Sequence, residues 1–317
     1  MNAEPSADRR GHPRGLWMLL GVTVGLNFAF YGFRAFVAPY LARTFFSAEP
    51  AGDAQRDANL LTAGVGAMLY ATHMFGGWIA DNVLGEVRAL RTALWIAAAA
   101  LALMAWPSRT VFVLGLAAYV LGAGLSIPLT VLIGRNYGPD DPRRDAGYTL
   151  YYLAINLGAF VAPFACADWI GRSFGYRYGF LAAGAGAALS ALVFHWRSGP
   201  LQARQPRPRF GGPRALPAVL LGMLALLIPT MLLLEHSQIL GSAVDLLLGL
   251  LVVYFVVRSA RRGDRVQTHR YVAMLLLFGA NIVFWALSLQ GATSLNFFAR
   301  DYVRAPFDFS LFQSANP

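Results

Sequence analysis

Nine stretches of this chain are apolar and long enough to cross a lipid bilayer, which takes about 20 residues of α-helix. They predict membrane-spanning helices at 15–42, 59–80, 88–106, 110–134, 148–169, 176–196, 215–235, 242–258 and 270–299. Hydrocarbon offers no partner to an exposed backbone N–H or C=O group, so segments of this kind pair those groups within helices. We therefore expect an all-α, polytopic membrane protein.

Composition agrees with a membrane protein and argues against nucleic acid as a partner. Of the 317 residues, 57% are hydrophobic and only 13% are charged. The net charge of +10 comes from arginine alone, because the chain contains no lysine. The arginines concentrate before the first predicted span and after the second, fourth, sixth and eighth. This alternation is the positive-inside pattern, and it predicts a cytoplasmic N-terminus.

The sequence carries none of the signatures that would indicate a common enzyme. It has no H-E-x-x-H, no G-x-S-x-G, no Walker loop and no clustered pair of acids within a span. Cys166 is the single cysteine, which excludes a disulfide framework or a cysteine metal cluster within this chain. We expect no enzymatic activity, no cofactor and no metal.

A Pro-, Gly- and Arg-rich segment divides the chain. The sequence SGPLQARQPRPRFGGPR occupies 198–214 and is typical of a linker. It separates a six-helix block at 1–197 from a helix pair at 215–258. The remaining 259–317 holds one further predicted helix and ends in FDFSLFQSANP, which would suit the approach to another span.

Polar residues recur along one face of the first predicted helix. Thr23, Asn27, Tyr31 and Arg34 follow one another at i, i+4, i+8 and i+11, which places all four on the same side. A charged or amide group in hydrocarbon costs a few kcal/mol unless it faces a partner or a wet cavity. The stripe therefore predicts a polar interior, and transport is the function that best explains one.

The loop GGWIADNVLGEVRALR at 76–91 resembles the loop signature of the major facilitator superfamily. There, a Gly-x-x-x-Asp core with trailing arginines latches helices on the cytoplasmic side through charge–dipole and ion-pair contacts. The resemblance implies a gating role for Gly76, Gly77, Asp81 and Arg88. An ordinary basic loop with a helix-capping aspartate explains the same residues.

Three more fragments resemble the proton-dependent oligopeptide transporter (POT) family of that superfamily. FAFYGFRAFVAPYL at 28–41 is similar to the first-helix signature E-x-x-E-R-F-x-Y-Y-G. YYLAINLGAFVAP at 151–163 is similar to the fifth-helix F-Y-x-x-I-N motif, and FWALSLQGATSLNFFA at 284–299 to the seventh-helix F-W-x-x-x-E-Q-x-x-S-L-N. The resemblance implies a major-facilitator N-terminal six-helix bundle, then the helix pair that bacterial members insert, then the first helix of the C-terminal half. It also implies the bacterial inner membrane.

The departures from the family concern charged groups. Thr23, Leu26 and Asn27 replace two glutamates and an arginine, Ile127 replaces the fourth-helix lysine, and Leu289 replaces the seventh-helix glutamate. In the family these groups take the proton and hold the charged ends of the peptide. An unpaired partner within the membrane is costly, so the loss of one member favours loss of the others.

Several polar residues remain that could bind a peptide or a related small organic solute. The resemblance implies this role for Tyr31, Arg34, Tyr70, Asn156, Tyr152, Trp285 and Gln290, and the polar stripe of the first helix adds Asn27. An amide such as Asn156 donates and accepts at once, which suits a peptide bond. An interhelical hydrogen bond by Asn156 and a snorkelling Arg34 are the structural alternatives.

His73 is the group with a near-neutral pKa that lies well inside a predicted span, so it is the candidate for any proton coupling that remains. A histidine hydrogen-bonded between helices is the simpler interpretation. We expect a secondary transporter homologue for di- or tripeptides with weakened or lost proton coupling. The alternative is a non-transporting membrane scaffold or binding protein. Because the family's cavity lies between two halves, we also expect a missing C-terminal half in cis.

Overall fold

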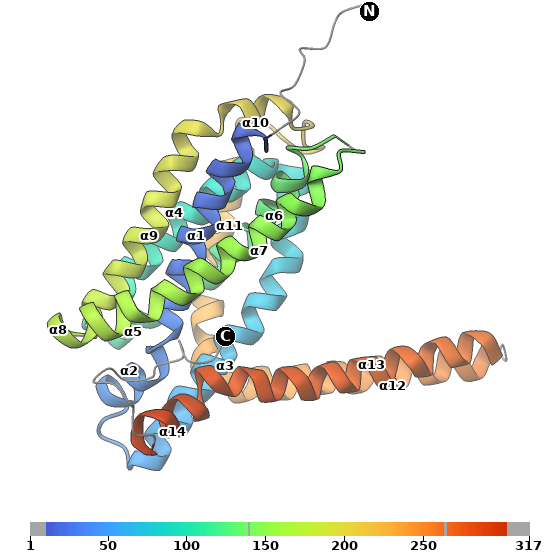
Figure 1. Cartoon of the computed structure of the whole chain (residues 1–317). Helices are drawn as coiled ribbons and strands as arrows, with labels where there is room; N and C mark the ends of the chain where they lie inside the picture. The colour runs from blue at the N-terminus through green and yellow to red at the C-terminus, as the bar shows by residue number, and fades with distance from the viewer. Residues whose placement is uncertain (1–10, 139, 263–264, 303–317) are drawn as a thin grey trace, which may run out of the picture. The chain divides into compact units, whose positions relative to one another are not determined.

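The computed structural model describes residues 11–138, 140–262 and 265–302, and these are helical throughout apart from turns and short connections (Figure 1). The predicted FQSANP approach to a further span lies outside the described residues. Seven helical segments are long and apolar enough to cross a membrane, and they coincide with seven of the nine predicted spans. The other two, at 59–80 and 242–258, form helices that fall outside this set.

The described residues divide into two compact units, which we treat separately. The first contains 11–33 and 68–228, and the second contains 34–67 and 229–302. The elements that fall mainly in the first unit are α1 (Arg14–Arg34), α4 (Glu86–Met104), α5 (Arg109–Gly124), α6 (Pro128–Gly134), α7 (Arg143–Ala162), η2 (Pro163–Gly171), α8 (Arg172–Phe174), α9 (Tyr176–Arg197), α10 (Gly199–Arg204) and most of α11 (Ala215–Glu235). It also contains the end of α3 (Ala51–Ile79) and the π-helical turn η1 (Ala80–Leu84).

Proline and glycine interrupt the predicted spans. The continuous helix that was predicted at 110–134 is interrupted: α5 ends at Gly124 and α6 begins at Pro128, which has no backbone N–H to donate to the preceding turn. At Pro163 the chain passes into the π-helix η2, since proline cannot donate the backbone hydrogen bond of an α-helix. Gly85 adopts a φ of 78° and separates η1 from α4.

Helix α4 is the centre of the first unit and packs against α5, α6 and α9. Glycines allow the close approach: a Cβ on Gly115 would lie 2.8 Å from the Ala100 carbonyl oxygen, and one on Gly184 would lie 3.2 Å from Leu101. Small residues are what helices in a bilayer use to pack, because apolar side chains gain little by leaving lipid.

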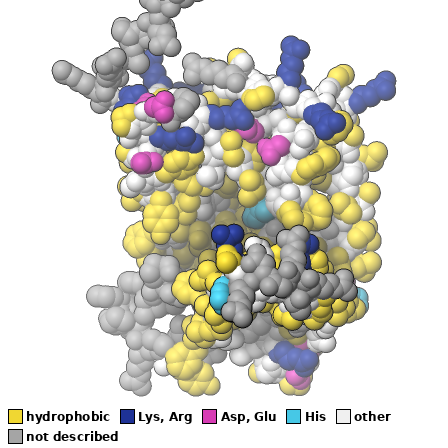
Figure 2. Space-filling view, turned by 90° about the vertical axis from the view of Figure 1, so that its right-hand side faces the viewer, with side chains coloured by type: hydrophobic (Ala, Val, Ile, Leu, Met, Phe, Trp, Pro, Cys, Tyr) yellow, Lys and Arg dark blue, Asp and Glu magenta, His cyan; other side chains and the backbone are white. Residues whose placement is uncertain are grey.

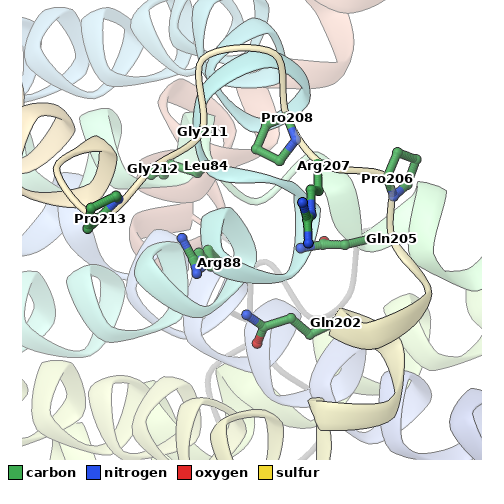
Figure 3. Close-up of a pocket in the computed structure, with 10 residues that line it drawn as sticks. All are labelled: Leu84, Arg88, Gln202, Gln205, Pro206, Arg207, Pro208, Gly211, Gly212 and Pro213. Atoms are coloured by element: carbon green, nitrogen blue, oxygen red, sulfur yellow. The ribbon is translucent and has the colours of Figure 1, made fainter.

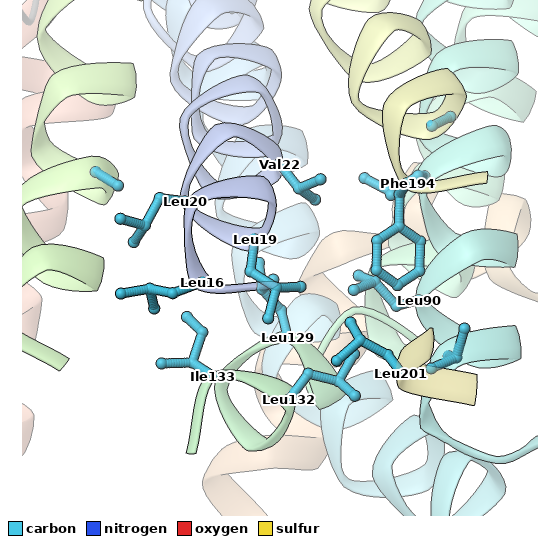
Figure 4. Packing of buried hydrophobic residues seen from close by; sticks show 14 of the residues in the cluster. Leu16, Leu19, Leu20, Val22, Leu90, Leu129, Leu132, Ile133, Phe194 and Leu201 are labelled. Atoms are coloured by element: carbon cyan, nitrogen blue, oxygen red, sulfur yellow. The ribbon is translucent and has the colours of Figure 1, made fainter. Parts of the chain in front are cut away.

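The largest described core, whose side chains Figure 4 shows, lies at the end of this bundle where α1 begins and α6 and α9 end. We call it the Arg-rich end, because Arg14, Arg135 and Arg197 stand at these helix ends. Leu16 and Leu19 of α1, Leu90 of α4 and Phe194 of α9 are fully buried, and α6 adds Ile133. A second cluster joins η1 and α4 to α11 through Leu84, Ala89, Ala93 and Ala215. The predicted linker at 198–214 begins with the short helix α10, whose Leu201 belongs to the first core.

The second unit contains α2 (Val37–Thr44), α12 (Ser237–Arg262), α13 (Arg265–Ser288), the 3-10 turn η3 (Leu289–Ala292) and α14 (Ser294–Tyr302). Helices α12 and α13 pack as a hairpin, in which the Ser259 hydroxyl donates to the Thr268 hydroxyl at 2.8 Å. The Arg258 Nε donates to the Tyr271 hydroxyl at 3.3 Å. The last predicted span, 270–299, is not one helix, because α13 ends at Ser288 and is followed by η3 and α14.

Candidate functional site

Two members of the polar stripe of α1 donate to the backbone of their own helix, and the expectation that all four members line a common interior is wrong at Thr23. That side chain is fully buried, and its hydroxyl donates to the Leu19 carbonyl at 2.7 Å. Asn27 is half-buried, and its amide donates to the Thr23 carbonyl at 2.9 Å. Tyr31 is half-buried with its ring edge-on to Phe30, 5.0 Å between centroids.

Helix α7 crosses α1 at Asn27. A Cβ on Gly158 would lie 3.0 Å from the Asn27 Cβ and equally close to the Phe28 nitrogen. Asn27 therefore lies at a tight helix crossing, and its amide NH₂ donates within α1 to the Thr23 carbonyl. Among the described residues its carboxamide oxygen has no hydrogen-bond donor, and it remains available as an acceptor.

The opposite side of α7 presents Tyr152 and Asn156. Tyr152 is 67% exposed, and Asn156 is exposed two residues before the buried Gly158. The Asn156 amide donates to the Tyr152 carbonyl at 2.8 Å, which fixes the side chain along the exposed face. The structure thus brings these two predicted site residues together. The structural alternative for Asn156, an interhelical hydrogen bond, is not formed in the described part of the chain.

Tyr70 and His73 lie where α3 packs on α5. Tyr70 is 62% exposed, whereas His73 is half-buried beside the backbone of Ala123. One residue earlier, the Thr72 hydroxyl lies 3.0 Å from the Val120 carbonyl. His73 is therefore held at a helix–helix contact, and no charged group acts on it among the described residues.

The remaining predicted binding residues belong to the second unit. Arg34 is the last residue of α1 and is half-buried. Trp285 is 43% exposed and packs edge-on against Phe284, 5.5 Å between centroids. Gln290 is exposed in η3, directly after the end of α13. The 3-10 turn starts at Leu289, the position at which the POT motif has its glutamate.

The predicted gating residues Asp81 and Arg88 are not among the residues that form ion pairs in the described loop. Both of these are exposed and form no ion pair within the described residues. Gly76 is buried against the Gly124 backbone, and a side chain there would collide with it, whereas Gly77 only touches Ile127. Gly76 therefore allows the close packing of α3 on α5.

The contacts that hold the loop come from Glu86 and Arg91. Glu86 opens α4, is 5% exposed, and accepts an ion pair from the Arg135 guanidinium at 2.6 Å. Arg91 donates to the Ser198 hydroxyl at 2.8 Å and to the Gln202 side-chain oxygen at 3.4 Å. The sequence analysis predicted neither the Glu86–Arg135 ion pair nor the hydrogen bonds of Arg91. The available signal was that Glu86 is the acid in the first turn of a span and Arg135 the first cation after another.

The profile of the POT family matches residues 90–313 of this chain. This match covers more than half of the sequence. The chain belongs to the POT family. The resemblance that the motifs at 28–41, 151–163 and 284–299 indicated is thereby confirmed.

Relatives and solved structures agree with this assignment. A peptide transporter of Yersinia enterocolitica is 29% identical over 96% of this chain, and a dipeptide and tripeptide permease A of Cronobacter turicensis is 30% identical over 96%. The chain spans about 65% of the first and 62% of the second. A crystal structure of a peptide transporter POT in complex with sulfate superimposes with a TM-score of 0.80, at 30% identity, over 99% of this chain and 67% of that one. The fold is thus that of a multi-pass helical membrane protein of the major facilitator type.

Proposed function

We propose that this chain forms part of a secondary transporter for di- and tripeptides or related small organic solutes, with weakened or lost proton coupling. Family membership carries the first half of the proposal, because relatives named as peptide transporters match along almost the whole chain. The exposed pair Tyr152 and Asn156 supplies a hydroxyl and an amide on one helix face, which suits the backbone of a peptide.

The proposed weakening or loss of proton coupling rests on neutral side chains. Leu26, Asn27, Ile127 and Leu289 stand where the family carries ionisable groups, and Ile127 and Leu289 are exposed rather than packed into the core. Proton coupling in a transporter requires ionisable groups that change their charge during the cycle. His73 is the candidate that remains, and it is half-buried next to the contact between Thr72 of α3 and the Val120 carbonyl of α5.

The binding cavity also needs a second half. In this superfamily the substrate site lies between two halves that rock against each other. A C-terminal half in cis is supported by the relatives, of which this chain spans only about two thirds, and by the exposed face of α7. We further propose that the protein works in the bacterial inner membrane with its N-terminus in the cytoplasm, because arginines concentrate in alternate loops.

Uptake of labelled dialanine and trialanine into proteoliposomes tests the transporter proposal, using the full product of the gene that encodes this chain. We expect saturable uptake whose initial rate changes less than about twofold when the proton gradient is dissipated. Uptake that collapses with the gradient would contradict the loss of coupling. Absence of flux, with ligand or partner binding retained, would replace the transporter with the scaffold alternative.

A further inference from the structure

A cavity of about 510 Å³ lies at the Arg-rich end of the first unit, between the start of α4 and the segment that follows α10 (Figure 3). Leu84 and Arg88 line it from η1 and α4. Gln202, Gln205 and Arg207 line it from the other side, followed by the proline- and glycine-rich segment 206–213. This cavity is distinct from the exposed face of α7 that carries Tyr152 and Asn156.

The cavity walls are fixed by hydrogen bonds between segments distant in the sequence. The Gln205 side-chain oxygen accepts from the Val87 backbone N–H at 3.1 Å, which caps the first turn of α4. The Phe210 N–H donates to the Asn82 carbonyl at 2.7 Å. The segment 205–213 also contains three prolines, which restrict its backbone. A cavity held in this way needs little ordering before a ligand binds.

The charges on the cavity wall have one sign. Arg88 and Arg207 both line it, and Figure 3 shows them on facing sides, with the Gln205 side chain beside Arg207. Gln202, which also lines the cavity, accepts from the guanidinium of Arg91, one turn along α4. Among the described residues no carboxylate lines the cavity: the nearby Glu86 is paired with Arg135, and Asp81 is exposed outside it. Guanidinium groups flanked by amide donors are the usual partners of phosphate.

The cavity lies beside the ends of helices that are long and apolar enough to cross a membrane. Two membrane-spanning segments begin beside it, α4 at Glu86 and α11 at Ala215. Trp78 and Phe210 lie at the same level with 57% and 56% of their surface exposed, and their ring centroids are 6.4 Å apart. Tryptophan side chains such as that of Trp78 concentrate at the membrane–water interface, because the indole ring is amphipathic. In Figure 2, arginine side chains gather at the upper end above surfaces that are largely hydrophobic.

We propose that this cavity binds a phosphate group, and that the phosphate belongs to the headgroup of an anionic phospholipid. Basic pockets between spans at the cytoplasmic side are suited to such headgroups. The two arginines contact the phosphate, the Gln202 and Gln205 amides bind its ester oxygens, and the acyl chains extend along the adjoining spans.

Native mass spectrometry of the detergent-purified chain, titrated with phosphatidylglycerol or phosphatidylcholine, tests the proposal. We expect tighter binding of phosphatidylglycerol. The double substitution Arg88→Gln/Arg207→Gln should weaken that binding by roughly 10- to 30-fold, from about 1 kcal/mol per arginine near a membrane surface. The matched control is Arg144→Gln/Arg197→Gln, which removes the same charge from exposed positions at the Arg-rich loops.

Three outcomes would overturn the proposal. If the control pair weakens binding as much as the cavity pair, the effect is the general charge of this end and not the cavity. If the cavity variant binds phosphatidylglycerol as the unsubstituted chain does, the cavity is not the site. If inorganic phosphate at millimolar concentration displaces the lipid fully, the phosphate source is soluble and not a headgroup. Circular dichroism of each variant confirms that the helices remain folded.

Discussion

Glu86 depends on Arg135 for its charge. The carboxylate is buried at the start of α4, and one of its oxygens has no hydrogen-bond partner in the described part of the chain. The helix N-terminus favours a negative charge, but only by about 0.3–1 kcal/mol where it is exposed. Arg135, 2.6 Å away and partly exposed, supplies the remaining stabilisation. Removing the Arg135 cation should therefore lower the stability of the protein more than removing the Glu86 carboxylate does.

We expect Arg135→Gln to destabilise the protein by about 1–3 kcal/mol, a range reduced from the value for fully buried pairs because Arg135 is partly solvated. Glu86→Gln should cost less, since a neutral amide tolerates burial better than an unpaired carboxylate. Thermal unfolding in detergent measures both changes, with the exposed Arg197→Gln as the control for charge. Equal losses in the two variants would show that the pair, and not the orphaned charge, determines stability.

Asp141 provides a pH-dependent contact before α7. Hydrogen bonds from the Arg143 side chain and backbone lower the pKa of the Asp141 carboxyl from 3.8 to about 2. Because the folded-state pKa is depressed, the contact stabilises the turn fully above the unfolded value and is lost as the pH falls towards 2.

The Tm difference between the unsubstituted chain and Asp141→Asn should therefore be constant above about pH 5 and should shrink below pH 4. Differential scanning fluorimetry between pH 2 and 6 measures it. A difference that stays constant down to pH 2 would exclude the carboxylate as its source. The exposed Asp145→Asn, within the first turn of α7, controls for the loss of one negative charge.

Residue-scale prediction succeeded where the chemistry is local. Tyr152 and Asn156 were both predicted as binding residues, and their spacing of four residues is enough to place them on one helix face. The Glu86–Arg135 pair could not be predicted in that way, because it joins the first residue of α4 to the residue after α6, and these are distant in the sequence. Thr23 was misplaced for a related reason: helical spacing gives a common side, but the hydroxyl can bond to its own helix.

At the scale of elements, the crossing of α3 and α5 is the tightest contact near the predicted site. A Cβ on Gly124 would lie 2.5 Å from the Thr72 carbonyl oxygen, and a Cβ on Gly76 would meet the Gly124 backbone. The crossing also positions His73 beside Ala123. Backbone atoms cannot move aside as a flexible side chain does, so the two helices must separate to admit a methyl group.

Gly124→Ala should therefore destabilise the protein by about 1–3 kcal/mol, as overpacking does elsewhere. Gly222→Ala is the matched control, because Gly222 lies in α11 with open space around its would-be Cβ. There the substitution should stabilise by about 0.4–1 kcal/mol through the unfolded chain. Thermal unfolding distinguishes the two by sign. A neutral Gly124→Ala would show that the crossing tolerates separation.

The positions of the spans followed from hydropathy, but their internal breaks did not. The windows at 88–106, 176–196 and 215–235 agree with α4, α9 and α11 within two residues at each end. Hydropathy averages over a window and so does not register the missing N–H of Pro128 or Pro163. It underestimated the length of α3, because the helix begins at Ala51 and runs through the polar residues Asp53 and Asp57, which a hydropathy window excludes.

At the scale of the whole molecule, the decisive question is which described groups take part in transport. Helix α13 has no buried residue within its most apolar window, and Asn156 on α7 is exposed. A second half that covers such surfaces would place Asn156 against substrate and leave His73 in its contact with α5. The two residues are therefore expected to affect uptake in different ways.

Asn156→Ala should lower peptide uptake by the full gene product about 3- to 10-fold, the equivalent of one hydrogen bond to a peptide group. His73→Gln should leave both the rate and its pH independence unchanged, because glutamine can replace the histidine as a donor between helices. Initial rates in proteoliposomes at pH 5.5, 6.5 and 7.5 measure both variants. If His73→Gln removes a pH dependence that the unsubstituted protein shows, the histidine carries the proton and coupling has been kept. If Asn156→Ala leaves uptake unchanged while His73→Gln abolishes it, the solute binds against α3 and not against α7.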